Sequence, residues 1–184
     1  MSIKKVKIIS IISIFIISFL FHQLYTWIPI KLFSIFFPVN ESIFEHLKMI
    51  FTTISFWLLI ETFLLNKTNS NNVILSNLTA SLSTIISFLL LYLLVEKIFN
   101  GYSTIPTLIT YFISISLGQL ISYYILSLKN NYDILNIISL ILIPIIFTIF
   151  GYLTYNPIKT KIFYDKYHDK YGIYNYYTLD NFDK

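Results

Sequence analysis

The sequence predicts an all-α integral membrane protein, a bundle of about five transmembrane helices with a short interfacial segment between the first two. Composition is the first indication, because the 184 residues are 56% hydrophobic and only 12% charged. A soluble domain of this length carries about twice that charged fraction. The second indication is that the charges are segregated, which leaves several windows of about twenty residues almost free of them. We expect a single five-span transmembrane domain (1–155) followed by a Tyr- and Lys-rich interfacial tail (156–184).

Five apolar segments are long enough to cross about 30 Å of hydrocarbon at 1.5 Å per residue. They cover residues 8–28, 44–65, 73–95, 105–128 and 134–155, and short polar connections separate the last four. The first follows MSIKKVK like the apolar region of a signal peptide, but no small-residue cleavage site follows, so we interpret it as a retained span. The apolar loop 29–39 is too short to span and is predicted to lie in the interface, with a sixth span as the alternative.

An odd number of spans determines which loops share a membrane face. The loop 29–43, the loop 96–104 and the tail are expected on one side, where they can meet. Lysines flank the spans on both sides in nearly equal number, so the positive-inside rule leaves the orientation open.

The residue types missing from the chain exclude some chemistries. The chain has no Cys, which excludes disulfides, thiolate zinc sites and thiol catalysis. All 13 basic residues are Lys, and with the abundant Ile, Asn, Tyr and Phe this is typical of an AT-rich, prokaryotic genome. We therefore expect location in a prokaryotic cell membrane, with the lipid bilayer as partner and no nucleic acid; protein partners stay open.

The stretch PVNESIFEH (38–46) gathers polar groups at the start of the second span. Ser42 and Glu45 fit a capping box, and Asn40 is an equally good helix cap. A helix that enters a membrane needs such caps, because unsatisfied amides there are costly. Capping accounts for these polar groups without any function.

Capping does not account for the two histidines at this end of the spans. His22 lies near the end of the first span and His46 near the start of the second, so both are roughly 6–9 Å below the same interface. Intramembrane ionisable residues suggest a functional site. The candidate catalytic residues are His22, Glu41, Glu45 and His46, among which a Glu and a His could act as an acid–base pair. Alternatively, His22, Glu41 and His46 are the candidate ligands of a divalent metal. Interhelical hydrogen bonding is the alternative.

Other polar groups in the spans have structural interpretations. Glu61 is predicted to extend toward the opposite interface, and Gln119 to hydrogen-bond between helices. Small residues on the third and fourth spans, among them Ala80 and Gly118, predict a packing seam.

Three stretches of the chain together resemble a known family: FHQLYTW (21–27), PVNESIFEHLK (38–48) and YGI (171–173). They are similar to a family of small prokaryotic multi-pass membrane proteins with a PVNES-x-x-EHLK motif, domain of unknown function 6512. The resemblance implies the fold, supports the candidate site and adds Asn40, Lys48 and Asp165 as candidate binding positions, but it implies no reaction. Lys166, His168 and Asp169 depart from the Pro, Thr and Gly of the family's tail pattern, which argues against a tight turn there.

Three functional classes remain open after the resemblance. The first is a membrane-embedded enzyme, such as a metal-assisted hydrolase that acts on lipid-like substrates. The second is a transporter or small-ligand binder, and the third is a non-catalytic membrane component whose motif caps and packs helices. The cofactor is not defined beyond a possible divalent metal.

Overall fold

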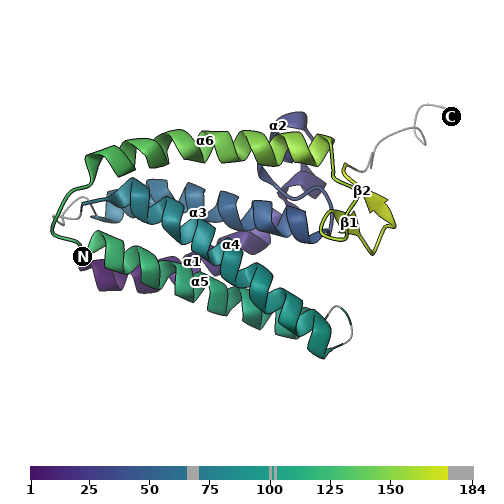
Figure 1. Cartoon of the computed structure of the whole chain (residues 1–184), viewed down its shortest axis with the longest axis horizontal. Helices are drawn as coiled ribbons and strands as arrows, with labels where there is room; N and C mark the ends of the chain where they lie inside the picture. Colours follow the sequence, from purple (N-terminus) through teal and green to yellow (C-terminus); the bar gives the residue numbers. More distant parts are fainter. Residues whose placement is uncertain (66–70, 100, 102, 174–184) are drawn as a thin grey trace.

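The computed structural model describes residues 1–65, 71–99, 101 and 103–173. Within this part of the chain it contains six α-helices and one two-stranded antiparallel sheet (Figure 1). The helices are α1 (Ile3–Trp27), α2 (Lys31–Phe36), α3 (Ile43–Leu65), α4 (Val73–Ile98), α5 (Thr104–Leu126) and α6 (Asp133–Tyr155), and the strands are β1 (Tyr164–Asp165) and β2 (Lys170–Tyr171). The predicted all-α architecture is confirmed.

Five helices of the described chain, all except the short α2, are long and apolar enough to span a membrane. Their bounds agree closely with the predicted spans. Large apolar side chains face outward from them, including Ile16, Leu59 and Ile134, each more than half exposed. Such a surface suits contact with lipid, because apolar side chains need no hydrogen-bond partners there and the helices satisfy their own backbone N–H and C=O groups.

The short helix α2 occupies the segment between the first two spans. Its six residues cannot cross a bilayer, so the short segment is confirmed and the alternative of a sixth span is wrong. It packs against α6, where the buried Ser34 hydroxyl lies 2.8 Å from the Tyr155 hydroxyl.

The predicted sharing of one face is confirmed. Figure 1 shows α2 and the β1–β2 hairpin at one end of the bundle, and the N-terminus with the α5–α6 connection at the other. At the hairpin end, the Glu96 carboxylate of α4 forms ion pairs with Lys161 at 3.0 Å and Lys166 at 2.6 Å. The end of α4 and the tail therefore meet, on the face that the odd number of spans assigns to both.

The predicted seam of small residues joins α4 and α5. Ala80 and Thr84 of α4 are buried against Gly118 of α5. A Cβ built on Gly118 would come within 2.7 Å of the Ala80 carbonyl oxygen, so only glycine permits this approach.

The tail forms a tight hairpin, which corrects the prediction against a turn there. β1 pairs with β2 in the register Tyr164 to Tyr171 and Asp165 to Lys170. The Asp165 carboxylate accepts the backbone N–H groups of Tyr167 and His168, at 2.7 and 3.2 Å, and so closes the turn without the proline of the family pattern. Asp169, at a φ of 53°, provides the left-handed residue. The predicted boundary between domain and tail stays a prediction, and residues 174–184 lie outside the described part of the chain.

Candidate functional site

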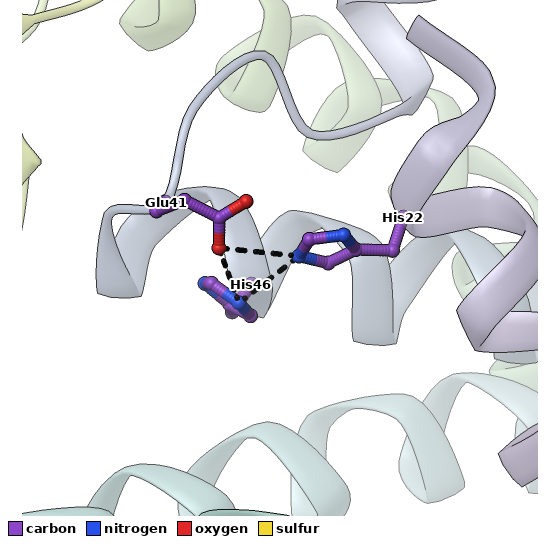
Figure 2. A group of neighbouring side chains, drawn as sticks. All are labelled: His22, Glu41 and His46. Atoms are coloured by element: carbon purple, nitrogen blue, oxygen red, sulfur yellow. Dashed lines mark hydrogen bonds and ion pairs between the residues drawn. The ribbon is translucent and has the colours of Figure 1, made fainter. Parts of the chain in front are cut away.

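Three ionisable side chains from separate segments converge at the hairpin end of the bundle (Figure 2). The Nε2 atom of His22 lies 3.3 Å from the Nε2 atom of His46 and 3.4 Å from Oε2 of Glu41. The same Glu41 oxygen lies 3.6 Å from Nε2 of His46. One atom from each residue therefore points at a common centre, and we call these residues the His–Glu–His cluster.

The cluster follows from the way the chain enters and leaves the first two long helices. His22 lies in the last turns of α1, and His46 in the first turn of α3, which packs against α1. Glu41 precedes α3, and its carboxylate points toward both rings (Figure 2). The equal depth predicted for the two histidines accounts for their meeting.

Hydrogen bonds define the protons on the two rings. The Nδ1–H of His46 donates to the Ser42 carbonyl oxygen at 2.8 Å, which leaves its Nε2 lone pair directed at the cluster. The His22 Nδ1 atom lies 3.3 Å from the Gln23 amide nitrogen, so it accepts, and the Nε2–H of His22 faces both Nε2 of His46 and the Glu41 carboxylate. The interaction with His22 lowers the pKa of Glu41, against the opposing effect of partial burial. Glu41 is therefore an anion beside two imidazoles.

The backbone at Glu41 is held by Asn40 and Asp165, two of the predicted binding residues. The Glu41 N–H donates to the Asp165 carboxylate at 2.9 Å. The Asn40 side chain accepts the Ser42 N–H at 2.8 Å and donates to the Gly172 carbonyl oxygen at 2.8 Å. Both side chains attach the loop to the tail, so the polar groups expected to bind a ligand serve internal bonds here. Their role in ligand binding stays a prediction.

Glu45 and Lys48 form a separate, fully buried ion pair. Their charged atoms lie 2.5 Å apart, and the two side chains are 1% and 0% exposed. The Lys48 amine also donates to the Ser34 carbonyl oxygen and to Thr154, each at 2.8 Å. Glu45 accepts the Val39 N–H at 3.1 Å, and its own N–H donates to Ser42 at 3.4 Å, so only one half of the predicted capping box forms. The structure thus directs Glu45 away from the cluster, and its catalytic role stays an untested prediction.

Two cavities meet at the His–Glu–His cluster. The inner cavity, of about 230 Å³, lies among α1, α3, α4 and α5 and is lined by all three cluster residues together with mainly apolar side chains such as Met49 and Leu108. The outer cavity, of about 250 Å³, lies under the tail and is lined by Glu41, His46 and tail residues. The cluster is therefore reachable from a space large enough for a small ligand.

The distances within the cluster suit a tetrahedral metal ion. With bonds of about 2.0–2.2 Å to zinc, neighbouring ligand atoms of a tetrahedron lie about 3.3–3.6 Å apart. The three measured separations are 3.3, 3.4 and 3.6 Å. His46 already has the Nδ1–H to carbonyl bond typical of metal-binding imidazoles. His22 would need its proton on Nδ1, with the Gln23 amide rotated to accept it.

Sequence reasoning missed a buried group at the opposite end of the bundle. Glu61 was expected to extend to the interface, but its side chain is 1% exposed and forms an ion pair with Lys7 of α1. The Lys7 amine also donates to Gln119 of α5 at 3.1 Å, which confirms the interhelical role predicted for that amide. The prediction for Glu61 was wrong because the sequence did not show that α1 supplies a cation at the same depth.

The fold and the polar cluster define the class of the protein, a multi-pass membrane protein with an ionisable site near one end of its helix bundle. The chain belongs to the DUF6512 family, a family of unknown function, which matches residues 1–173. The resemblance found in the sequence is therefore confirmed. No curated protein and no solved structure matches the chain.

Proposed function

We propose that the His–Glu–His cluster binds a divalent metal ion and that the protein is a membrane-embedded, metal-dependent hydrolase. The observation that carries the proposal is the set of three ligand-atom separations, which fits a tetrahedral ion with one position left for water or substrate. Two imidazoles and one carboxylate are also the ligand set of several hydrolytic zinc enzymes.

Each residue of the cluster has a distinct part in the proposal. His22 and His46 supply neutral nitrogen ligands, and Glu41 supplies an anionic oxygen that offsets part of the charge of the ion. Asp165 positions Glu41 through its backbone, and Ser42 orients the His46 ring. The ion itself would supply Lewis-acid polarisation of an ester oxygen and activation of water.

Hydrolysis is the reaction class that the surroundings favour. The cluster lines two cavities, so a substrate could approach an ion held by His22, Glu41 and His46. In hydrolysis an ester bond breaks, the water oxygen joins the acyl or phosphoryl group, and a proton goes to the leaving alcohol. This reaction needs no group beyond the ion, water and the residues present.

Metal analysis of purified protein tests the proposal. Protein purified in a neutral detergent without chelator is expected to retain about one zinc, manganese or iron ion per chain, measured by mass spectrometry of the elements. His22→Ala, Glu41→Gln and His46→Ala should each weaken metal binding by more than about 100-fold, because ligands matter more than the supporting residues that cost about 10–100-fold. The matched control is Asp133→Asn, since this exposed carboxylate begins α6 at the opposite end of the bundle.

Two results would reject the proposal in separate parts. Metal retained equally by the folded His46→Ala protein would exclude the cluster as the binding site. Metal-loaded protein that hydrolyses no member of a panel of carboxylic and phosphate esters with apolar tails would exclude the hydrolytic function. In that case the alternative is a non-catalytic or ligand-binding membrane protein whose cluster joins α1 to α3.

A further inference from the structure

The inner and outer cavities adjoin and have contrasting chemistry. They share Glu41, His46, Phe88 and Thr107, so they lie next to each other at the His–Glu–His cluster. The inner cavity is bounded by Phe19, Met49, Ile50 and Leu108, while the outer one is bounded by Lys161, Tyr164, Lys166 and Tyr167. A molecule that fills both would have an apolar end and a polar end on either side of the cluster.

The charge of the outer cavity comes from two lysines that share one carboxylate. Lys161 and Lys166 both pair with Glu96, whose side chain is 11% exposed. The lysine side chains are 65% and 44% exposed, so their amines are accessible. Two cations opposite one anion leave one positive charge in excess beside Glu96, while the anionic Glu41 lies at the cluster end of the cavity. Amines of this kind bind phosphate oxygens through charge-assisted hydrogen bonds.

We propose that the substrate is an anionic amphiphile, with a phosphate head between Lys161 and Lys166 and an apolar tail in the inner cavity. Hydrolysis of this molecule rests on the proposed function, whereas its binding does not. The bond between head and tail would then lie beside the His–Glu–His cluster. Glu96 holds the two amines in place until the phosphate replaces it as their partner.

The tyrosines of the tail fit this arrangement. Tyr164 and Tyr167 line the outer cavity beside the lysines. Aromatic side chains with a polar tip prefer the depth of lipid head groups, where the head of such a substrate also lies. The C-terminal tail of the protein would therefore cover the phosphate head, while the apolar chain of the substrate stays in the helix bundle.

Native mass spectrometry of metal-free protein released from neutral detergent tests the binding. The probes are n-decyl phosphate, n-decyltrimethylammonium and inorganic phosphate. Decyl phosphate is expected to bind at least about tenfold more tightly than either of the others, since only it has both the anionic head and the tail. Equal retention of the two amphiphiles would overturn the anionic head, and equal binding of inorganic phosphate would overturn the apolar tail.

Variants locate the two ends of the probe. The double variant Lys161→Ala/Lys166→Ala should bind decyl phosphate about tenfold more weakly, whereas the exposed Lys159→Ala should match the parent protein. Glu96→Gln should strengthen binding, because it frees both amines from their competing partner. Unchanged affinity in the double variant or weaker affinity in Glu96→Gln would each refute the assignment.

The outcome is separable from that of the proposed function. Metal content is measured on the same preparations before the metal is removed. A preference for decyl phosphate in protein that never contains metal would reject the metal-dependent hydrolase and keep this binding site. Stoichiometric metal without any preference among the probes would reject this inference alone.

Discussion

Removal of one partner from the buried Glu45–Lys48 pair should strongly destabilise the protein. Lys48→Met takes away the cation 2.5 Å from Glu45 and leaves that carboxylate 1% exposed. Among the described residues, the carboxylate would keep the Val39 N–H and the Thr154 hydroxyl as partners. An uncompensated buried charge of this kind costs about 3–5 kcal/mol of the free energy of unfolding.

The double variant Glu45→Gln/Lys48→Met separates the interaction from its parts. Each single variant leaves one buried charge without its partner, whereas the double variant removes both charges. The double variant should therefore lose less than the sum of the single variants, with a coupling energy of about 1–3 kcal/mol. Lys129→Met is the matched control, because Lys129 is exposed and its replacement should change stability by less than about 0.5 kcal/mol.

The assay is equilibrium unfolding in mixed detergent micelles, followed by far-ultraviolet circular dichroism. All variants are compared under one micelle composition, so that differences in free energy refer to the same unfolded state. Single variants that each cost less than about 1 kcal/mol, or costs that simply add, would refute the reasoning. Either result would mean that water reaches this pair in the folded protein.

Three further predictions concern other parts of the molecule. Gly118→Ala should lower the free energy of unfolding by about 1–3 kcal/mol, because its methyl group would meet Thr84 and a carbonyl oxygen of α4 at 2.7 Å. Adding Thr84→Ala should recover part of this loss, and an unchanged free energy of unfolding in Gly118→Ala would contradict the close packing. Lys7→Met should lower the free energy of unfolding by about 3–5 kcal/mol in the same assay, since Glu61 would lose its ion-pair partner. If the double variant Lys7→Met/Glu61→Gln is no more stable than Lys7→Met, the ion pair does not account for the loss. Asp165→Asn should weaken metal binding of the His–Glu–His cluster by about 10-fold with the helices intact by circular dichroism, and unchanged metal affinity would show that the tail does not position the cluster.

The long helices and the meeting of the two histidines could be predicted because each depends on distance along the chain. Span length follows from the number of apolar residues, and the depths of His22 and His46 follow from their distance to the connecting loop. Adjacent helices joined by a short connection pack together, so equal depth was enough to bring the rings close. The approach of α4 to α5 was also visible in their small residues.

The partners of the buried carboxylates could not be predicted in the same way. Lys7 and Glu61 lie on helices whose apolar residues surround each helix on all sides, so no periodic pattern defines which face is turned inward. Helix capping was a sufficient explanation for Glu45 in the sequence, whereas in the structure its carboxylate pairs with Lys48, three residues further along α3. Lys161 and Lys166 reach Glu96 because the tail lies against the end of α4. The hairpin that contains Lys166 is closed by the side chain of Asp165, not by a turn motif in the sequence.

The attachment of the tail to the loop before α3 has a consequence for biosynthesis. Asn40 and the Glu41 backbone are fixed by Gly172 and Asp165, which the ribosome adds more than a hundred residues later. During synthesis the two histidines can meet as soon as α1 and α3 are inserted, but the carboxylate above them has no anchor. The His–Glu–His cluster would therefore be completed only after the last helix has been synthesised and the tail has folded back onto the loop.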